Sequence, residues 1–393
     1  MKRRSFLQNA SLISLAPSVP AFLPRANAGL NRKDNNGKIL VVLQLSGGND
    51  GLNTVIPFAD ERYAKHRPKL KIANDRVIKV NDSIGLHPQL KPMAELLDDG
   101  RLSIVQGVGY PNPNRSHFES MDIWHTARLK KGDRTGHGWL GRMIDANRKP
   151  AEDTSPDAVF VGDSEIPVAL RGRRANSISL NSENELRLFA SVAQPKTSSS
   201  DDDLTSFIRQ TLDSSYIAAK QFAENAPVAG DSSYPNSRLG RKLQLLSRMI
   251  KLGGSTQIFY VSQGGYDTHS DQLGRHDNLL RELSRGVAAF MEDMQNSKLA
   301  DRVLMLSFSE FGRRVTENAS VGTDHGTAGP VFVAGPVSNP GLIGSHPSLD
   351  DLDQGDLKMT TDFRSIYANV LSKWLHTDGL PDLPQVIGET AVL

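Results

Sequence analysis

Five short clusters along the chain carry residue types that could do chemistry. They are Ser46–Gly51, Tyr110–Glu119, Gly264–His269, Ser307–Arg314 and Gly322–Thr327. They combine carboxylates and imidazoles, which bind divalent cations, with a serine hydroxyl and several arginines. The chain has no cysteine, which excludes disulfides, iron–sulfur clusters and a cysteine nucleophile. A metal must therefore bind to nitrogen and oxygen ligands, a set that suits zinc first and also Mn, Mg or Ca.

The first cluster follows an apolar run, Ile39–Leu45, and ends in Asn49-Asp50-Gly51. Its glycines allow a sharp turn and a close approach of the backbone to a ligand. Asp50 is then well placed at a strand end to be a metal carboxylate. The alternative is a tight turn in which Asp50 hydrogen-bonds its own backbone.

The second cluster places Ser116 at the start of a helix that carries Met121, Trp124 and Leu129. A hydroxyl at a helix N-terminus faces the positive end of the helix dipole, which favours a nucleophile and an anion. The spacing Ser116-x-x-Glu119 is equally that of a capping box, whose only purpose is to satisfy free N–H groups. The neighbouring Arg115 and His117 favour a chemical role, and both are candidate catalytic residues.

The third cluster, Tyr266-Asp267-Thr268-His269, offers a carboxylate and an imidazole two residues apart on a loop, where both can reach one cation. His276 lies seven residues further on, on the apolar stripe of the next helix. A lone histidine there fits a hydrogen-bonded core residue better than a ligand.

The last two clusters add a second carboxylate, an arginine and a histidine. Glu310 is a candidate ligand or base, and Arg313 can bind an anionic group through two parallel hydrogen bonds. The alternative is a solvated Arg–Glu turn. Asp324-His325 lies between glycines just before an apolar strand, a position that packing explains poorly, so both are candidate metal ligands.

Apolar runs of strand length recur between these clusters and predict strands buried on both faces. They are Ile39–Leu45, Leu102–Gln106, Ala158–Val161, Gln257–Ser262, Val303–Phe308 and Val331–Ala334. Helical spacing is clearest over Asp271–Met294 and over Phe363–Leu375, which follows the cap Thr361-Asp362. Alternating strands and helices predict an α/β fold with a mostly parallel central sheet covered by helices on both faces. Sites in such sheets gather at the carboxyl ends of the strands.

The N-terminus carries an export signal. Arg3-Arg4 followed by Ser-Phe-Leu, an apolar stretch and the cleavage site Ala26-Asn27-Ala28 are typical of a twin-arginine signal over residues 1–28. The expected partner is the twin-arginine translocation machinery, and the expected location is the periplasm or another exported compartment. We expect one domain over 29–393, with a mobile helical insertion at 191–236.

Charge and hydropathy narrow the classes of partner. The formal charge of +2 falls to −2 when residues 1–28 and their four basic side chains are removed, which gives no support for nucleic-acid binding. No other stretch approaches the ~20 apolar residues needed to cross a bilayer, so we expect no stable membrane insertion of the mature chain.

The motifs together resemble a known family. Ser46–Thr54, Asn114–Phe118, Tyr266–His269, Ser309–Arg313 and Thr323–Thr327 are similar to the exported bacterial family named domain of unknown function 1501, which is grouped with alkaline phosphatases and sulfatases. The resemblance covers about Lys38 to Leu375. It implies an alkaline phosphatase-like α/β fold with a nucleophile beside one or two divalent cations.

The resemblance also implies roles for single residues. Asp50 would be a first metal carboxylate and Ser116 the nucleophile, while Asp267 and His269 would serve one cation. Glu310 would stand where relatives carry an Asp-His pair, and His325 would be the last ligand. Asp267-x-His269 departs from the usual Asp-x-x-x-His, and Phe311 follows Glu310 in place of histidine, so one of two metal sites would be altered or missing.

These observations lead to two hypotheses. The first is an exported, metal-dependent hydrolase of phosphate or related sulfate or phosphonate esters, acting on a small anionic ester. The residues after Ser116 do not fit the maturation motif of a formylglycine sulfatase. The alternative is a non-catalytic envelope binding or scaffolding protein on a phosphatase-like fold, because a fold does not fix a function.

Overall fold

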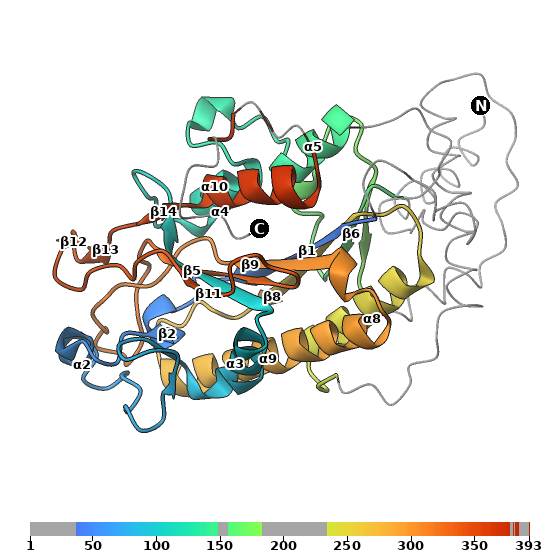
Figure 1. The fold of residues 1–393 in the computed structure, drawn as a ribbon. Coiled ribbons are helices and arrows are strands. Elements are labelled where there is room, and N and C mark those ends of the chain that lie inside the picture. Colours follow the sequence, from blue (N-terminus) through green and yellow to red (C-terminus); the bar gives the residue numbers. More distant parts are fainter. Residues whose placement is uncertain (1–36, 148–155, 183–233, 378–379, 381, 385–392) are drawn as a thin grey trace, which may run out of the picture.

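The structure is a computed structural model that describes residues 37–147, 156–182, 234–377, 380, 382–384 and 393. The expected signal over residues 1–28 lies outside this part of the chain, and of the expected insertion only residues 234–236 lie inside it. The described residues form a central sheet between two layers of helices (Figure 1).

Within the described residues, nine strands form the central sheet in the order β11-β5-β10-β9-β1-β8-β6-β7, with β14 also paired to β5. The strands are β1 (Ile39–Ser46), β5 (Leu102–Gly109), β6 (Ala158–Val161), β7 (Ser177–Leu180), β8 (Ile258–Gly264), β9 (Val303–Phe308), β10 (Gly329–Ala334), β11 (Gly341–Ile343) and β14 (Thr361–Asp362). All six predicted strands are confirmed, with ends shifted by at most a few residues.

The sheet is mostly parallel, as predicted, and β10 is the exception among the described strands. It runs antiparallel to both of its neighbours, β5 and β9, whereas the other neighbouring pairs are parallel. The start of β10 therefore lies at the edge where β1, β5, β8 and β9 end. This is why a cluster that precedes a strand joins clusters that follow strands.

Helices cover both faces of the sheet (Figure 1). One layer holds α3 (Lys91–Asp98), α8 (Arg238–Leu252) and α9 (Gln272–Asn296), and the other holds α4 (His117–Thr126), α5 (Trp139–Asn147) and α10 (Phe363–Asn369), which continues as a π-helical turn, Val370–Trp374. Alternate residues of β1 serve the two cores: Val41 and Leu43 pack with the first layer, and Leu40 and Val42 with the second. Burial on both faces explains the unbroken apolar run of β1.

The helix boundaries follow local chemistry. The predicted helix after Asp271 begins at Gln272, because Asp271 takes a left-handed conformation with φ of 47°. Asp362 caps α10 by accepting a hydrogen bond from the Arg364 backbone N–H. The helix after Ser116 ends at Thr126, because Ala127 is left-handed with φ of 57°, so Leu129 lies beyond the helix in which the sequence predicted it.

Small elements complete the described fold around a third apolar cluster that includes Leu52, Tyr63 and Val315. They are α2 (Glu61–His66), a sheet of β2 (Val55–Ile56), β4 (Gly85–Leu86) and β3 (Ile78–Lys79), and a hairpin of β12 (Leu352–Asp353) and β13 (Asp356–Leu357). Short 3₁₀ turns lie at Gly51–Asn53, Pro88–Leu90, Lys131–Asp133, Val168–Leu170 and Ala300–Arg302.

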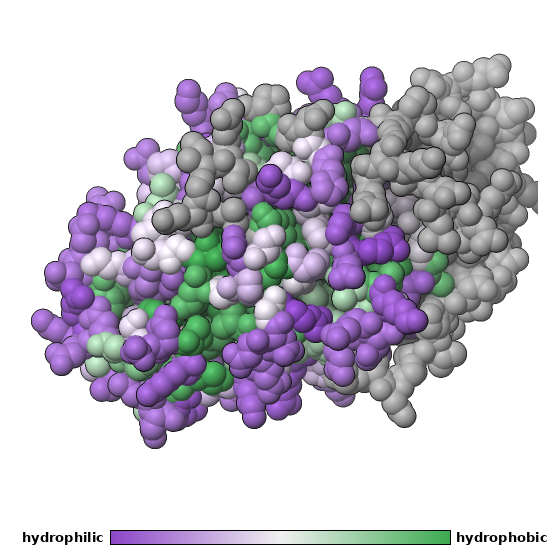
Figure 2. Space-filling view, viewed as in Figure 1, coloured by the Kyte–Doolittle hydropathy of each residue, from purple (hydrophilic) through white to green (hydrophobic). Residues whose placement is uncertain are grey.

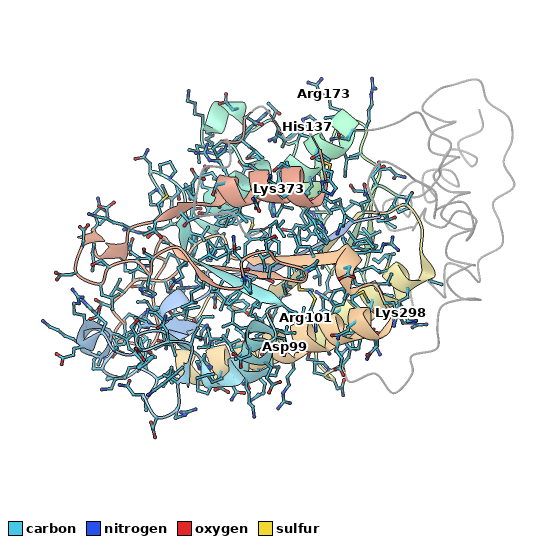
Figure 3. The ribbon with its side chains drawn as sticks, in the orientation of Figure 1. Asp99, Arg101, His137, Arg173, Lys298 and Lys373 are labelled. Atoms are coloured by element: carbon cyan, nitrogen blue, oxygen red, sulfur yellow. The ribbon has the colours of Figure 1, made fainter. Side chains whose placement is uncertain are left out.

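The surface fits this layered arrangement. In Figure 2, hydrophilic residues cover most of the visible face, and hydrophobic residues gather in its middle, between the two helical layers. Arg101, labelled in Figure 3, joins the start of β5 to α9 by donating to the Gln295 side chain at 2.6 Å and to the Met291 carbonyl at 3.1 Å. Among the described helices, none is both long enough and apolar enough to span a membrane.

Candidate metal centre

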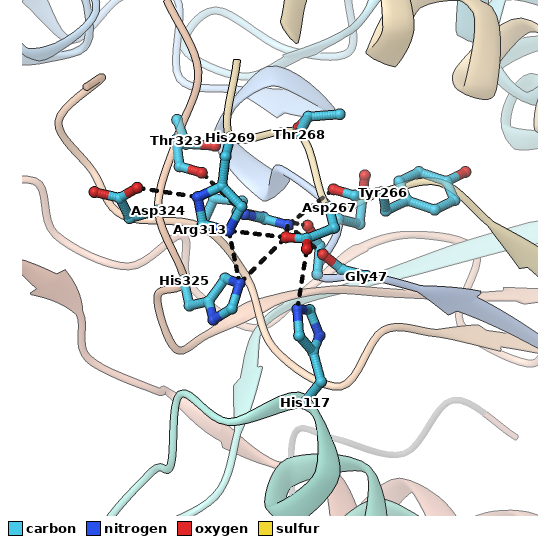
Figure 4. Close-up of polar contacts among 12 residues, drawn as sticks. Gly47, His117, Tyr266, Asp267, Thr268, His269, Arg313, Thr323, Asp324 and His325 are labelled. Carbon is cyan, nitrogen blue, oxygen red and sulfur yellow. Dashed lines mark hydrogen bonds and ion pairs between the residues drawn. The ribbon is translucent and has the colours of Figure 1, made fainter. Parts of the chain in front are cut away.

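Side chains from three chain segments meet at the edge of the sheet where most strands end (Figure 4). Asp267 and His269 follow β8, His325 precedes the reversed strand β10, and His117 opens α4 after β5. Chain segments up to about 200 residues apart in sequence thus supply one cluster. We refer to Asp267, His117, His269 and His325 as the His₃Asp cluster.

The His₃Asp cluster is organised around the Asp267 carboxylate. Its Oδ1 lies 3.0 Å from His269 Nε2 and 3.2 Å from His325 Nε2, and its Oδ2 lies 3.5 Å from His117 Nε2. The two Nε2 atoms of His269 and His325 are 2.9 Å apart. Ligand atoms of His117, Asp267 and His325 all lie within 4.8 Å of one another, which is close enough to hold a single cation.

Each histidine of the cluster uses its other ring nitrogen, Nδ1, to bind an oxygen outside the cluster. These acceptors are Glu310 for His117 at 2.8 Å, Asp324 for His269 at 3.0 Å and the Arg115 carbonyl for His325 at 2.7 Å. A carboxylate or a carbonyl can only accept, so each Nδ1 carries the proton and each Nε2 presents a lone pair. Metal-binding histidines are held in this way in proteins.

A divalent cation fits this donor set. Two Nε2 lone pairs 2.9 Å apart repel each other unless a proton or a cation lies between them. His117 Nε2 is buried and makes no hydrogen bond in the described part of the chain, so its lone pair can bind a cation. Three imidazoles and one carboxylate are a ligand set that Zn²⁺ favours.

The charges around the cluster hold Asp267 ionised. Burial alone raises the pKa of Asp267, but the hydrogen bond and charge of Arg313, with smaller contributions from His325 and His269, outweigh it and hold the pKa at about 2. The hydrogen bond to Glu310 raises the pKa of His117. Asp267 is therefore ready to bind a cation at any pH near neutrality, whereas the raised pKa of His117 means that a cation competes with a proton for this ring.

Arg313 is buried beneath the cluster and holds its loops together. Its guanidinium donates to the carbonyls of Gly48 at 2.7 Å, Thr323 at 2.9 Å and Tyr266 at 3.0 Å, to the Gly47 carbonyl, and to Asp267 Oδ1 at 2.7 Å. The sequence predicted Arg313 as a catalytic residue that binds an anionic group. In the structure its donors are committed to the protein, so it positions Asp267.

Glu310 lies behind the cluster as well. Its Oε1 accepts from His117 Nδ1 and from the Gly47 backbone N–H, both at 2.8 Å, and the side chain is 1% exposed. The alternative of a solvated Arg–Glu turn is wrong, because Glu310 and Arg313 are both buried. Glu310 and Asp324, predicted as ligands, instead accept hydrogen bonds from His117 and His269 and hold these rings in place.

The glycine turn after β1 makes this approach possible. A Cβ atom on Gly47 would lie 2.5 Å from the Asp267 backbone nitrogen, and one on Gly48 would overlap the Phe311 ring. Both glycines have positive φ, 120° and 78°. The Phe311 ring in turn packs 4.9 Å from the rings of His117 and His325, which closes the apolar side of the cluster.

Asp50 does not join the cluster. Both its oxygens bind the Arg67 guanidinium, at 2.5 and 3.0 Å, and Oδ2 also accepts from Gln272 at 2.5 Å. Both side chains of the ion pair are fully buried. The alternative in which Asp50 bonds its own backbone also differs from the structure. Arg67 lies at the end of α2 in no motif, and the sequence carried no signal for it.

Ser116 and His276 lie outside the His₃Asp cluster. Ser116 is the exposed N-cap of α4 and makes no capping hydrogen bond through its side chain, so the capping box is not formed. Glu119 instead pairs with Lys131 and Arg134. His276 is 2% exposed and bonds Asn49 Oδ1 at 3.0 Å, which confirms it as a core residue.

Arg115 lies at the rim of the cluster. It binds the buried Asp356 of the β12–β13 hairpin through its guanidinium, with Nε donating at 2.7 Å. Its carbonyl oxygen accepts from His325. Its side chain is 35% exposed, so it contacts both the protein and solvent.

Solved structures with a similar chain course are only distantly related. They are the C-terminal periplasmic domain of EcEptC from Escherichia coli in complex with Zn (11% identity, 81% of this chain and 77% of that chain, TM-score 0.38), a protein in the alkaline phosphatase superfamily from Vibrio parahaemolyticus (12%, 96% and 78%, 0.41) and the PsFucS1 sulfatase from Pseudoalteromonas sp. (10%, 92% and 74%, 0.43). Similarity at this level carries no argument about activity. No curated protein matches the chain.

The sequence matches a family model over most of its length. The match spans residues 37–376 and so includes every residue of the His₃Asp cluster, its supporting residues and the strands that position them. The chain belongs to the family described as Protein of unknown function (DUF1501).

Proposed function

We propose that the protein is an exported, metal-dependent hydrolase of phosphate esters or of related sulfate or phosphonate esters. One observation carries the proposal: ligand atoms of His117, Asp267 and His325 lie within 4.8 Å of one another at the edge of the sheet, and His269 Nε2 lies 2.9 Å from His325 Nε2. Acceptor lone pairs held this close together repel each other, so packing alone does not explain their arrangement.

The His₃Asp cluster would hold one cation, with Zn the best fit and Mn, Mg or Ca as further choices. When bound, such an ion polarises an ester oxygen and lowers the pKa of a nearby hydroxyl. We propose a single ion, because Arg67 already neutralises Asp50, the carboxylate expected to serve a second one.

Ser116 is the proposed nucleophile. It is exposed at the N-terminus of α4, directly beside His117, and its Oγ has no hydrogen-bond partner among the described residues. In the proposed reaction Oγ attacks phosphorus or sulfur, the bond to the leaving alcohol breaks, and water then hydrolyses the serine ester. The helix N-terminus favours the negative charge that develops. Arg115, partly exposed at the rim, is the side chain placed to bind an ester oxygen.

Export by the twin-arginine route is part of the proposal. That route carries folded proteins, so the metal is acquired before the protein reaches the periplasm. The supporting observation is the order of Arg3-Arg4, apolar stretch and Ala26-Asn27-Ala28 in the sequence.

The test is the variant Ser116→Ala, assayed with aryl phosphate, aryl sulfate and aryl phosphonate esters. We expect turnover to fall at least a hundredfold with metal content and thermal unfolding unchanged, because only the attacking oxygen is lost. Ser83→Ala, another exposed serine, is the matched control and should keep full turnover. Unchanged turnover in Ser116→Ala rules out Ser116 as the nucleophile.

A second candidate is a non-catalytic envelope binding or scaffolding protein. This candidate is supported by two buried arginines: Arg67 binds Asp50, and Arg313 binds Asp267. Both carboxylates are therefore neutralised within the protein, and no metal ion is needed to balance their charge. A folded exported protein with no bound metal and no turnover of any of the esters favours this candidate.

A further inference from the structure

A second cavity lies beside the His₃Asp cluster and shares no residue with it. It has a volume of about 680 Å³ and opens at the ends of β1, β6 and β8, against α8 and α9. These elements form the part of the sheet around β6 and α8 in Figure 1. The volume is that of a small-molecule site, and the carboxyl ends of parallel strands are where ligands bind in such sheets.

The floor of the cavity is a neutral hydrogen-bond network. Gln44 Oε1 accepts from the Tyr260 hydroxyl at 2.6 Å and lies 3.1 Å from His125 Nε2. Because this oxygen can only accept, His125 Nε2 carries a proton, and Nδ1 of the ring is then a bare acceptor. Burial lowers the pKa of His125 to about 3, so the ring is neutral at physiological pH.

Two polar groups remain on this floor without a partner among the described residues. They are the Gln44 amide N–H₂ group, a donor, and His125 Nδ1, an acceptor. Both side chains are more than nine-tenths buried and line the cavity. A donor next to an acceptor in the lining of a cavity is matched best by a ligand group that can both donate and accept.

The rim of the cavity carries charges of both signs, with three carboxylates, Asp163, Glu165 and Glu282, and two cations, Lys242 and Arg238. Lys242 Nζ donates to the Ser262 carbonyl at 3.3 Å and lies 3.7 Å from Asp163, and Arg238 lies 4.0 Å from the same carboxylate. Glu282 adds a further carboxylate from α9. The ion pairs are long, so these side chains can turn toward a ligand at small cost.

We propose that this cavity binds a neutral, hydroxyl-rich ligand of the size of a sugar. A hydroxyl group donates and accepts at once, which is what the Gln44 and His125 pair requires. An anion would face the His125 lone pair and the rim carboxylates, and a cation would face the Gln44 amide and the rim cations. Side chains such as Lys242, Asp163 and Glu282 are suited to bind the outer hydroxyls.

The inference does not depend on the proposed esterase activity. Ser46, which lines the cavity, is followed by Gly47, whose N–H binds Glu310 behind the His₃Asp cluster. Cavity and cluster are therefore neighbours along the same edge of the sheet. Sugar binding is nevertheless a property of Gln44 and His125, and it stands whether or not an ester is cleaved.

The test is saturation-transfer NMR and calorimetry on the full exported protein. The probes are glucose, galactose, mannose, N-acetylglucosamine, maltose, cellobiose and lactose, with inorganic phosphate and sulfate as anionic comparisons. We expect at least one sugar to bind, Lys242→Met and Glu282→Gln each to weaken it at least tenfold, and Lys251→Met, the matched control on the same helix, to leave it unchanged. His325→Ala should also leave it unchanged, because it acts at the other site.

Three results would overturn the proposal. One is that no sugar of this set binds the wild-type protein. Another is that binding persists in both Lys242→Met and Glu282→Gln, which places the sugar elsewhere. The third is that phosphate or sulfate binds and Lys242→Met abolishes it, which makes the cavity an anion site. Thermal unfolding of both variants checks the fold, and either one alone suffices if the other is unstable.

Discussion

Replacing Glu310 with glutamine should weaken metal binding while leaving the fold intact. In the wild type, Oε1 accepts from His117 Nδ1 and from the Gly47 N–H at 2.8 Å each, and Oε2 lies 3.1 Å from the Ser309 hydroxyl. A glutamine oxygen can accept both of the first two bonds, and its amide group can donate to Ser309 Oγ. The change therefore removes one charge and little geometry.

The expected loss follows from what the charge does. A carboxylate behind a metal-binding histidine fixes the ring and strengthens its lone pair, and removing such a partner costs about 10–100-fold in metal affinity. That corresponds to about 1.4–2.7 kcal/mol. The pKa of His117 should also fall, because the hydrogen bond to Glu310 is the main cause of its upward shift.

The assay is a competition titration of zinc between the protein and a chelator at fixed pH, with the His117 pKa followed by NMR in the metal-free protein. Glu95→Gln, an exposed glutamate on α3, is the matched control and should change neither quantity. A Glu310→Gln protein that binds zinc within twofold of wild type and keeps the His117 pKa would refute the role given to Glu310.

Two further predictions concern the buried Arg67–Asp50 pair. Arg67→Met should lower the free energy of unfolding by about 3–5 kcal/mol in urea, because it leaves a buried carboxylate without its cation. Arg62→Met, at an exposed ion pair, should have a much smaller effect, and equal effects of the two variants would contradict this reasoning. Burial raises the pKa of Asp50, but the charge and hydrogen bonds of Arg67 outweigh burial, so the pKa in the folded state is lowered. The contribution of ionised Asp50 to the free energy of unfolding is therefore complete above about pH 4, and it is lost as the pH falls toward the lower pKa of the folded state. Unfolding measured from pH 6 to 3 should show this slope, and Asp50→Asn should reduce it.

Much of the fold could be predicted from the sequence because the strands of the sheet are buried on both faces. Such strands read as unbroken apolar runs, and β1 and β9 were found almost to the residue. The reversal of β10 could not be predicted, because a run that is apolar on both faces carries no sign of direction. That reversal is what brings His325 to the ligand edge.

The candidate site was predicted in part. Asp267, His269 and His325 stand out because polar residues beside glycines at strand ends are hard to explain by packing. The sequence could not distinguish candidate metal ligands from the residues that hold these ligands in place. Glu310 and Asp267 are both carboxylates, but Glu310 binds Nδ1 of His117, whereas Asp267 faces Nε2 of the same ring.

Interactions between side chains that are far apart in the sequence could not be predicted either. Asp50 was predicted as a metal ligand because no residue near it in the sequence indicated an ion pair. Its partner, Arg67, lies 17 residues away at the end of α2. His276 shows the opposite case. Its place on an apolar helical stripe predicted a core residue, and its burial and its bond to Asn49 confirm that reading.

Metal analysis of the protein after native export tests the central claim most directly. We expect one equivalent of a divalent metal per chain, lost in His325→Ala and in Asp267→Asn and retained in Asp50→Asn, with all three variants folded. A metal-free wild-type protein, or a metal content that Asp50→Asn abolishes and His325→Ala leaves unchanged, would contradict a metal centre at the His₃Asp cluster.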